Sequence, residues 1–407
     1  MRTFARRASA VTLALWMTAG HPVPAHAQGT ARSLDIDLSP VSSAMGGAST
    51  AVFWGDDLSH WGNPALLGYQ RGIRYEWQRS SLVPGLAQGV YLTSEAVKLG
   101  AGGVGIVLSG KPWGIGNRKL HYGWSEGVDE QGNPTGFFSD SYEKADSWGF
   151  GVSALQLAQS VLGIAGSQPA TLSRYGDVSF GMNFKDVVIA LAPGYVGGTA
   201  SASTRDVGVL VRLTPIDFLD RAGPAPVRVD LALGWATLNS NDAMFVFLNE
   251  DQASPATRHR RKGLALRVAA NPPGWALGPA RTSSARWILR KGLSPLLSIG
   301  AAADGAKLSA GGGEPSFETS GYGVEVTVAN VLSYRTGHYR DKEGDISGST
   351  GGWGVALPIG SLAGVRFDQA RFPQARSSDL PDVIRHAFSA WVDPLAFWRA
   401  MTSPAEQ

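Results

Sequence analysis

The sequence predicts an all-β fold: a transmembrane antiparallel β-barrel of about 14 strands with an N-terminal hatch inside its lumen. Three observations predict it. Only 17% of the 407 residues are charged, against about 25% in an ordinary soluble domain. Gly occurs 52 times, and each Gly in a helix interior costs about 1 kcal/mol relative to Ala. Apolar residues recur at every second position rather than in runs of about 20, so the chain is built from strands with one apolar face and not from membrane helices.

Residues 1–27 are typical of a secretory signal peptide. Three arginines lie within residues 2–7, an apolar stretch follows at 10–19, and Ala25-His26-Ala27 is a small-x-small cleavage site. Without these three arginines the 36 basic residues become 33, equal to the 33 acidic ones. A nucleic-acid partner inferred from overall basicity is therefore excluded. We expect an exported protein in the outer membrane of a Gram-negative bacterium.

Residues 28–71 differ in kind from the rest of the chain and predict the hatch. A run of small residues at 42–51 permits a tightly folded insert, and Pro64 ends regular structure while favouring an extended Asn63. The pair Asp56-Asp57 is open to two interpretations: gating of the hatch, or turns and caps around a short hatch element. The predicted hatch and gate residues are Trp54, Asp56, Asp57, Asn63, Pro64 and Ala65.

Residues 72–393 predict the barrel wall, and residues 394–407 a periplasmic tail. Clear alternation runs through Ile73–Gln78, Val178–Lys185 and Val227–Ala236. The residues between the apolar ones are Gly, Ala, Ser, Arg, Asp and Glu, whereas a soluble sandwich would expose mainly Lys, Glu and Thr there. At about 9–11 residues for each strand, plus its connection, this length holds about 14 strands, and about 12 would also fit.

Three connections are predicted to be long loops, at 111–146, 240–262 and 308–320. The basic run at 258–262 within the second is interpreted as solvated loop charge. The first is rich in aromatic residues, which predict either a capture site for an apolar ligand or anchoring and packing of the loop itself. The candidate ligand-capture residues are Trp113, Tyr122, Trp124, Phe137 and Phe138.

Catalytic and metal-binding patterns are not found. The chain has no Cys, no H-E-x-x-H and no G-x-S-x-G sequence, and the G-x-G-x-x-G match at 100–105 is followed by strand alternation instead of a helix. The five His residues beyond the signal peptide are isolated in sequence. We therefore predict that the protein is not an enzyme, with no catalytic residue, no metal and no cofactor.

Several short motifs, in this order, resemble the outer-membrane long-chain fatty acid transporter (FadL-like) superfamily and within it the PorV/PorQ-like branch. They are Ala44-Met45-Gly46-Gly47-Ala48, Asp56-Asp57 and Asn63-Pro64-Ala65, with Val331–Tyr339, Gly352–Val355 and Phe367–Arg371 in the C-terminal third. The resemblance implies a barrel of about 14 strands with an N-terminal hatch inside it. The chain departs from the pattern at Trp61-Gly62 before Asn63, and in running 14 residues beyond Asp393.

Two functions remain open at this stage. One is passive uptake of hydrophobic, fatty-acid-like small molecules, with the hatch as gate. The other is a PorV-like protein-binding barrel that serves protein secretion or surface attachment. Expected partners are outer-membrane lipid and either a hydrophobic ligand or exported proteins, with no nucleic acid. An apolar lumen would favour uptake; a lumen open through its loops, without an apolar pocket, would favour protein binding.

Overall fold

The computed structural model describes residues 30–55, 59–87, 89–128, 131, 133–164, 172–219, 226–250, 253–273, 291–310 and 317–402. The predicted signal peptide at 1–27 and the pair Asp56-Asp57 lie outside the described residues.

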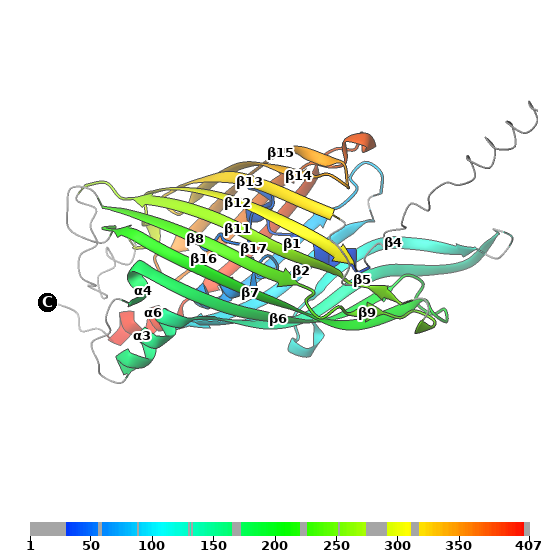
Figure 1. Cartoon of the computed structure of the whole chain (residues 1–407), viewed down its shortest axis with the longest axis horizontal. Coiled ribbons are helices and arrows are strands. Elements are labelled where there is room, and N and C mark those ends of the chain that lie inside the picture. Colours follow the sequence, from blue (N-terminus) through cyan, green and yellow to red (C-terminus); the bar gives the residue numbers. More distant parts are fainter. Residues whose placement is uncertain are drawn as a thin grey trace, which may run out of the picture.

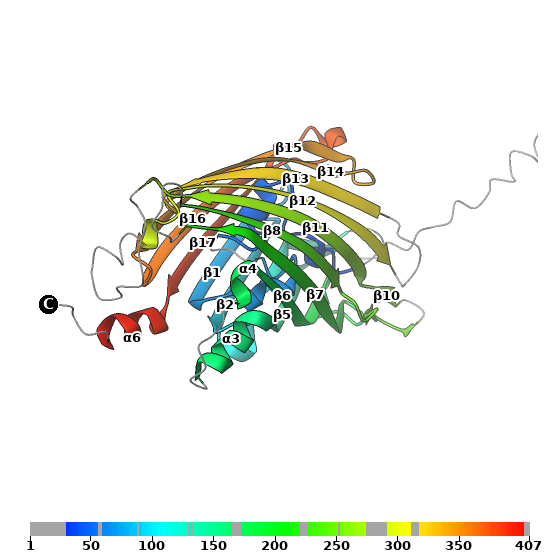
Figure 2. The same cartoon turned by 60° about the vertical axis from the view of Figure 1, so that its left-hand side comes forward.

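The main sheet is a closed antiparallel barrel (Figure 1, Figure 2). It closes because β1 pairs with β2 on one side and with β17, the last strand, on the other. Its strands are β1 (Gly72–Ser81), β2 (Tyr91–Ala101), β3 (Val104–Ser109), β4 (Arg118–Val128), β5 (Pro134–Ser153), β6 (Gly176–Ala190), β7 (Thr199–Asp217), β8 (Val227–Leu238), β11 (Thr257–Ala270), β12 (Leu297–Ala310), β13 (Phe317–Val328), β14 (Leu332–Asp341), β15 (Ile346–Ile359), β16 (Ala363–Phe372) and β17 (Val383–Val392).

Strands β3 and β4 share one position in the wall, so the 15 strands of this sheet fill 14 positions. Both lie between β2 and β5: β3 pairs with residues 97–101 of β2, and β4 with residues 91–93. Residues 110–117, which include the short helix η3 (Lys111–Trp113), interrupt the ladder between them. There the main-chain oxygen of Glu95 accepts a hydrogen bond from Ser109 Oγ at 2.5 Å. The predicted barrel of about 14 strands is confirmed.

The two ends of the barrel differ. At the end where β1 begins and β17 ends, called the terminal end, lie the helices α3 (Ala154–Ile164), α4 (Leu172–Tyr175) and α6 (Pro394–Thr402) (Figure 1, Figure 2). At the opposite, loop end, the β4–β5 hairpin projects beyond the other strands (Figure 1). The short strands β9 (Met244–Phe245) and β10 (Ser254–Pro255) and the helix η5 (Arg376–Ser378) lie in loops. None of the described helices has the length and apolarity to cross a membrane.

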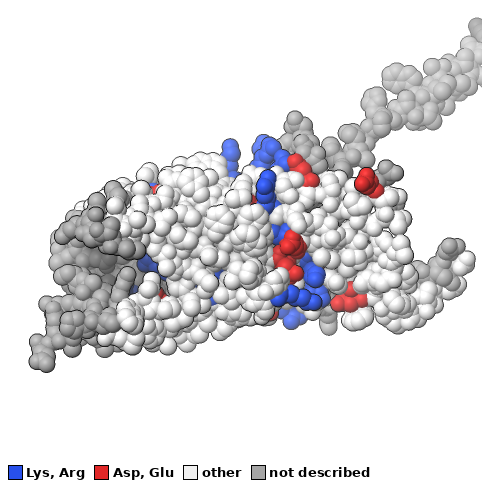
Figure 3. Space-filling view, turned by 90° about the horizontal axis from the view of Figure 1, so that it is seen from below, with Lys and Arg blue, Asp and Glu red and all other residues white. Residues whose placement is uncertain are grey.

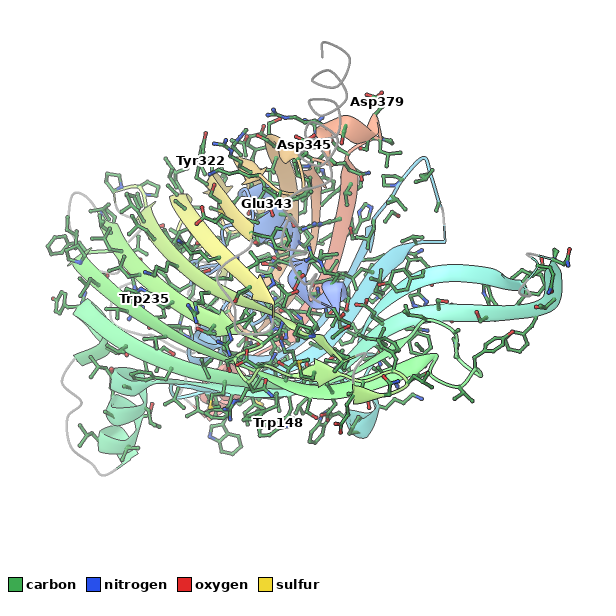
Figure 4. The ribbon with its side chains drawn as sticks, turned by 45° about the vertical axis from the view of Figure 1, so that its right-hand side comes forward. Trp148, Trp235, Tyr322, Glu343, Asp345 and Asp379 are labelled. Carbon is green, nitrogen blue, oxygen red and sulfur yellow. The ribbon has the colours of Figure 1, made fainter. Side chains whose placement is uncertain are left out.

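The barrel is apolar outside and polar inside. On β8, Leu231, Leu233 and Trp235 are 37%, 44% and 41% exposed, whereas the intervening Asp230 is 1% exposed. Trp148 and Trp235 point away from the lumen (Figure 4). On the face shown in Figure 3, charged side chains gather in one band, and the surface between this band and the terminal end is almost free of colour. This inverts the arrangement of a soluble protein and is what lipid contact requires.

The three predicted long loops have different outcomes. The second is present as a long connection, because β8 ends at Leu238 and β11 begins only at Thr257, whereas the first is wrong over most of its length. Most of 111–146 is β4 and the first part of β5, because register shifts at His121/Gly123 and Glu126/Val128 break the alternation by which strands are recognised. The basic run at 258–262 is not a solvated loop but part of strand β11. In the third region the residues that the structure describes are strand, since 308–310 end β12 and 317–320 begin β13.

Placing a charge on the outer face should prevent membrane insertion. We expect Leu231→Arg to destabilise the inserted barrel by about 2–4 kcal/mol if the residue lies near the bilayer midplane. The apolar control Leu231→Val should insert normally. Heat-modifiable migration on detergent gels reports the closed barrel; equal folded fractions for both variants would show that this face does not meet lipid.

Candidate functional site: the hatch and its seat

The hatch is the chain before β1, and it lies inside the lumen, shown in blue in Figure 1. It contains η1 (Arg32–Asp35), α2 (Pro40–Ala44) and η2 (Pro64–Tyr69). Ser39 caps α2 by accepting from the Ser42 main-chain N–H, and Pro40 is its first residue. Asn63 caps η2 in the same way: its Oδ1 accepts from the Ala65 N–H at 3.0 Å, ahead of Pro64. Proline after a polar cap starts a short helical turn, which is why these segments fold locally.

Five glycines on neighbouring strands form a continuous row on the inner face of the wall, and the hatch packs against this row. They are direct cross-strand partners in the order Gly100, Gly105, Gly151, Gly181 and Gly208. We call them the glycine row. A Cβ atom at the first four would lie 2.2 Å from Gln70 O, 1.9 Å from Leu67 O, 2.6 Å from Gly68 N and 2.3 Å from the carbonyl carbon of Pro64. Any side chain at these positions would displace hatch main chain.

Glycines on β8, β12 and β13 meet the hatch as well. A Cβ at Gly234 would lie 2.1 Å from Thr50 O, one at Gly323 2.5 Å from Met45 Cα, and one at Gly300 2.5 Å from the Trp54 ring. Each of these glycines points into the lumen, and along its strand the inward positions alternate with outward apolar residues. The sequence therefore shows an excess of small residues on the inner face of the wall. It does not show that the hatch packs on these positions.

A carboxylate on β12 fixes the small-residue run of the hatch. Asp304 Oδ2 accepts hydrogen bonds from the main-chain N–H groups of Ser49 at 2.9 Å and Thr50 at 2.8 Å, and from Thr50 Oγ1 at 2.7 Å. Arg261 Nη2 lies 3.2 Å from the same oxygen and donates to Gly47 O at 3.0 Å. Arg261 belongs to the basic run interpreted from sequence as solvated, so its contact with the hatch was missed.

Two further wall side chains hold the first turn of the hatch. The Arg118 guanidinium donates to the main-chain oxygens of Ser33 and Ile36, and it lies 4.5 Å from the centroid of the Trp61 ring. His259 Nε2 is 2.6 Å from Asp35 Oδ1. Neither contact is visible in the sequence, because the partners are separated by more than 80 and 220 positions, respectively.

Trp54, one of the predicted gate residues, ends a chain of buried charges. Its Nε1 donates to Glu325 Oε1 at 3.0 Å, and Glu325 Oε2 accepts from Arg335 Nε at 2.6 Å. Arg335 also donates to Asp368 at 2.8 Å, and Asp368 pairs with Arg366 at 2.6 Å. Hydrogen bonds to ionised groups are roughly twice as strong as neutral ones, so this chain ties the hatch to three strands of the wall.

The predicted residues Asn63, Pro64 and Ala65 lie together where the hatch meets the glycine row. Asn63 Nδ2 donates to Thr50 O at 2.8 Å and to Val209 O at 3.2 Å, while Ser179 Oγ donates to Ala65 O at 2.6 Å. The side chain of Asn63 thus joins two parts of the hatch to the wall. Its role in gating stays a prediction, and Asp56 and Asp57 lie outside the described residues.

His60 is a buried hatch residue that sequence reasoning left as one isolated histidine among five. It is 2% exposed and lies against Trp61, with 5.1 Å between the ring centroids and 40° between the ring planes. Burial, and then the positive charges of Lys98, Arg118 and Lys185, lower the pKa of its imidazole well below 6.5. His60 is therefore neutral at pH 7, and adding a proton there would place a further positive charge in an already cationic part of the lumen.

The lumen has two unlike halves. Toward the loop end it is filled by an apolar cluster of hatch and wall residues that includes Leu34, Trp61, Ile189 and Phe245. Toward the terminal end it contains a cavity of about 1540 Å³ with many charged side chains in its lining. The lumen is thus neither apolar throughout nor open through its loops, and this criterion alone decides for neither of the two functions.

The candidate ligand-capture residues occupy two places. Trp113 lies on η3, in the segment 110–117 that separates β3 from β4. The other four, Tyr122, Trp124, Phe137 and Phe138, lie on the projecting β4–β5 hairpin. Trp124 and Phe138 are 73% and 57% exposed, and Phe137 packs edge-on against the Tyr195 ring. The hairpin also touches the hatch: the Tyr122 hydroxyl donates to Glu143, whose other oxygen accepts from the Ser33 N–H at 2.9 Å.

Comparison with known proteins finds similar barrels at low identity. No protein-family model and no curated protein matches the sequence. The toluene transporter TbuX of Ralstonia pickettii is 11% identical with a TM-score of 0.40, covering 87% of this chain and 98% of that one. The toluene transporter TodX of Pseudomonas putida is 12% identical with a TM-score of 0.36, at 87% and 98% coverage. An anion-selective porin from Comamonas acidovorans is 10% identical with a TM-score of 0.29, at 78% and 96% coverage. TM-scores this low do not place the chain in a family.

A single methyl group in the glycine row should unseat the hatch. We expect Gly181→Ala to destabilise hatch binding by about 1–3 kcal/mol, since its Cβ would overlap the Pro64 main chain. The matched control is Gly305→Ala on β12, where nothing lies within 4 Å of the added Cβ. Planar-bilayer recordings should show frequent openings for Gly181→Ala alone. Silent recordings from both variants would mean that the hatch does not depend on this contact.

Proposed function

We propose that the protein is a hatch-gated channel in the outer membrane of a Gram-negative bacterium, for passive uptake of small hydrophobic molecules. The observation that carries the proposal is the seat of the hatch, whose main chain packs directly on wall glycines inside the lumen. A solute crosses only when the hatch moves. Membership of the FadL-like superfamily and a fatty-acid-like ligand belong to this proposal, supported by the motif resemblance at 44–48 and 63–65.

The hatch is held in a way that lets it move without opening the wall. Its attachments are side-chain hydrogen bonds, such as those of Asp304 and Asn63, each worth about 0.5–3 kcal/mol depending on charge. The wall is held by main-chain ladders that close on themselves through β1 and β17. A shift of the hatch therefore breaks a limited set of contacts while the barrel stays intact.

Capture of the ligand is assigned to the β4–β5 hairpin. Trp124, Phe137 and Phe138 are exposed there, beyond the loop end of the barrel. Covering such surface is favourable by about 25 cal/mol per Å², which suits weak, non-directional binding of an apolar molecule. Glu143 accepts hydrogen bonds from both the Tyr122 hydroxyl and the Ser33 N–H. These two bonds connect the hairpin with the hatch, so that ligand binding at the hairpin can move the hatch.

A second candidate function is protein binding, as in a PorV-like barrel. It is favoured by the extent of exposed apolar surface in the neighbouring β6–β7 and β8–β11 loops, where Val196 is 93% and Leu248 58% exposed. Large exposed apolar patches rimmed by polar residues often mark protein interfaces. Under this function the hatch is a permanent seal, and exported proteins are received at the loop end.

Removing the hatch should turn a silent barrel into a leak. Deletion of residues 30–68 is expected to leave an insertable barrel with steady conductance, because wall hydrogen bonds close independently of the hatch. The control deletion of residues 394–402 removes α6 at the other terminus and should remain silent. A heat-modifiable barrel that lacks residues 30–68 and carries no current would exclude the hatch as the gate.

Removing the exposed aromatics should slow uptake without opening the channel. We expect Trp124→Ala together with Phe138→Ala to lower the rate of uptake of a fluorescent apolar probe into proteoliposomes by at least fivefold. Trp398→Ala on α6, a 63% exposed tryptophan at the other end, is the control. Uptake that is unchanged in the double variant, with binding of an exported protein lost, would favour the second function.

A further inference from the structure

Four basic side chains form a group on the outer surface of the wall, toward the loop end of β11, β12 and β14. They are Arg260, Lys262, Lys307 and Arg340, and we call them the basic patch. Arg260 and Lys262 lie on the same face of β11 as Leu264, which belongs to the outer apolar surface and is 52% exposed. The basic patch therefore faces away from the lumen and is separate from the hatch and its seat.

The register of the sheet places these side chains in two adjacent rows. In the row nearer the loop end, Arg260 and Lys307 are direct cross-strand partners. The next row toward the terminal end consists of the successive partners Lys262, Gly305, Ser320 and Arg340. Like charges directly opposite each other on a sheet are destabilising. An anion that lies between Arg260 and Lys307 would therefore stabilise this part of the wall.

Carboxylates of the wall and loops neutralise the basic patch only in part. Glu318 on β13 pairs with Lys307, with 3.0 Å between its Oε1 and the lysine Nζ. The preceding arginine of the basic run, Arg258, pairs with Asp242 and is not available for a further anion. In the part of the chain that the structure describes, no carboxylate forms an ion pair with the other three members of the patch. Their charges are free to act on a partner outside the protein.

Small residues leave open space between the basic side chains. Gly305 and Ser320 separate Lys262 from Arg340, and a Cβ atom at Gly305 would have no other atom within 4 Å. Neighbouring strands lie about 4.8 Å apart, so the three strand spacings between Lys262 and Arg340 amount to roughly 14 Å. A single small ion cannot contact cations spread over this width. A headgroup that carries phosphates at more than one position can.

The outer surface becomes aromatic and apolar directly on the terminal side of the basic patch. Trp235 on β8 is the cross-strand partner of Lys262 and is 41% exposed. Tyr322, two positions beyond Ser320 on the same face of β13, is 61% exposed. Exposed aromatic residues of membrane barrels lie at the level where hydrocarbon meets the lipid headgroups. The basic patch is thus at headgroup level, and the surface next to it suits acyl chains.

We propose that the basic patch binds the phosphorylated sugar headgroup of a lipopolysaccharide molecule, whose acyl chains lie along the apolar wall beside it. Guanidinium groups bind phosphate oxygens in pairs, and ammonium groups bind them as point charges. The first and last strands of the wall both have their free ends at the terminal end, and barrels of this kind turn their longer loops outward. The loop end then lies in the outer leaflet, where lipopolysaccharide is found. The inference rests on the proposed outer-membrane location and not on uptake, so it applies equally to a channel and to a protein-binding barrel.

Lipid binding to the intact, detergent-purified protein tests the proposal. The probes are diphosphoryl lipid A, which is the membrane anchor of lipopolysaccharide, and the same lipid after removal of its phosphates, each measured by native mass spectrometry. We expect the phosphorylated lipid to bind at least tenfold more tightly, and an equal concentration of inorganic phosphate not to displace it. Equal binding of the two lipids, displacement by inorganic phosphate, or equally tight binding of phosphatidylglycerol would overturn the proposal. Lipid A binding together with a folded hatch deletion that carries no current would reject the channel and leave this site standing.

Substitutions then locate the site on the wall. Lys262→Gln together with Arg340→Gln should weaken binding of lipid A at least tenfold, whereas Lys262→Arg together with Arg340→Lys, which keeps both charges, should retain most of it. The matched control is Arg79→Gln together with Lys144→Gln, which removes the same charge from outward positions of β1 and β5. Heat-modifiable migration verifies that each barrel is folded. Unchanged affinity in the folded Lys262→Gln and Arg340→Gln variant, or an equal loss in the control, would exclude the basic patch as the binding site. If the neutralised variant does not fold, the comparison of the two forms of lipid A on the unaltered protein still decides.

Discussion

The contact of hatch main chain with wall glycines is the constraint on which the other features depend. Five adjacent strands present Gly at the same level, so the segment around Pro64 lies against the sheet without intervening side chains. The polar anchors, Asp304, Arg118 and the Trp54–Glu325 pair, act on a segment whose position the glycines already determine.

The same contact explains why the lumen divides into two halves. Packing around the hatch leaves apolar residues such as Ile189 and Phe245 to fill the loop end, where hatch and loops cover one another. On the terminal side of the hatch none of the segments that the structure describes fills the space, and charged side chains line a cavity. Burying ions in a closed, dry interior would be far more costly than lining a cavity with them. The charged residues therefore stand on the side of the hatch that is hollow.

Sequence patterns predicted the architecture well and the site only in part. Alternation such as that of β8 depends on neighbours two positions apart, so the barrel, its inward polar face and the hatch as a separate segment were all predictable. The β4–β5 hairpin was taken for a loop because two register shifts interrupt that alternation. Contacts such as Arg261 with Gly47 or Arg118 with Ser33 join residues that are far apart in the chain, and no local pattern encodes them. Asn63 and Trp54 were recognisable as hatch residues, but their partners Val209 and Glu325 were not.

The place of the hatch at the start of the chain bears on how the molecule assembles. Gly46 and Ala44 contact Thr350, some 300 residues later, while the chain runs from Gln70 directly into β1. The wall cannot close until β17 reaches β1, and by then the hatch must already be within the forming sheet, because a finished ring of ladders offers it no lateral entry. Folding must therefore wrap fourteen strand positions around a segment that was synthesised before any of them. Contacts of such long sequence separation form slowly, so the hatch, which precedes every strand of the wall in the chain, is among the last segments to make all its contacts.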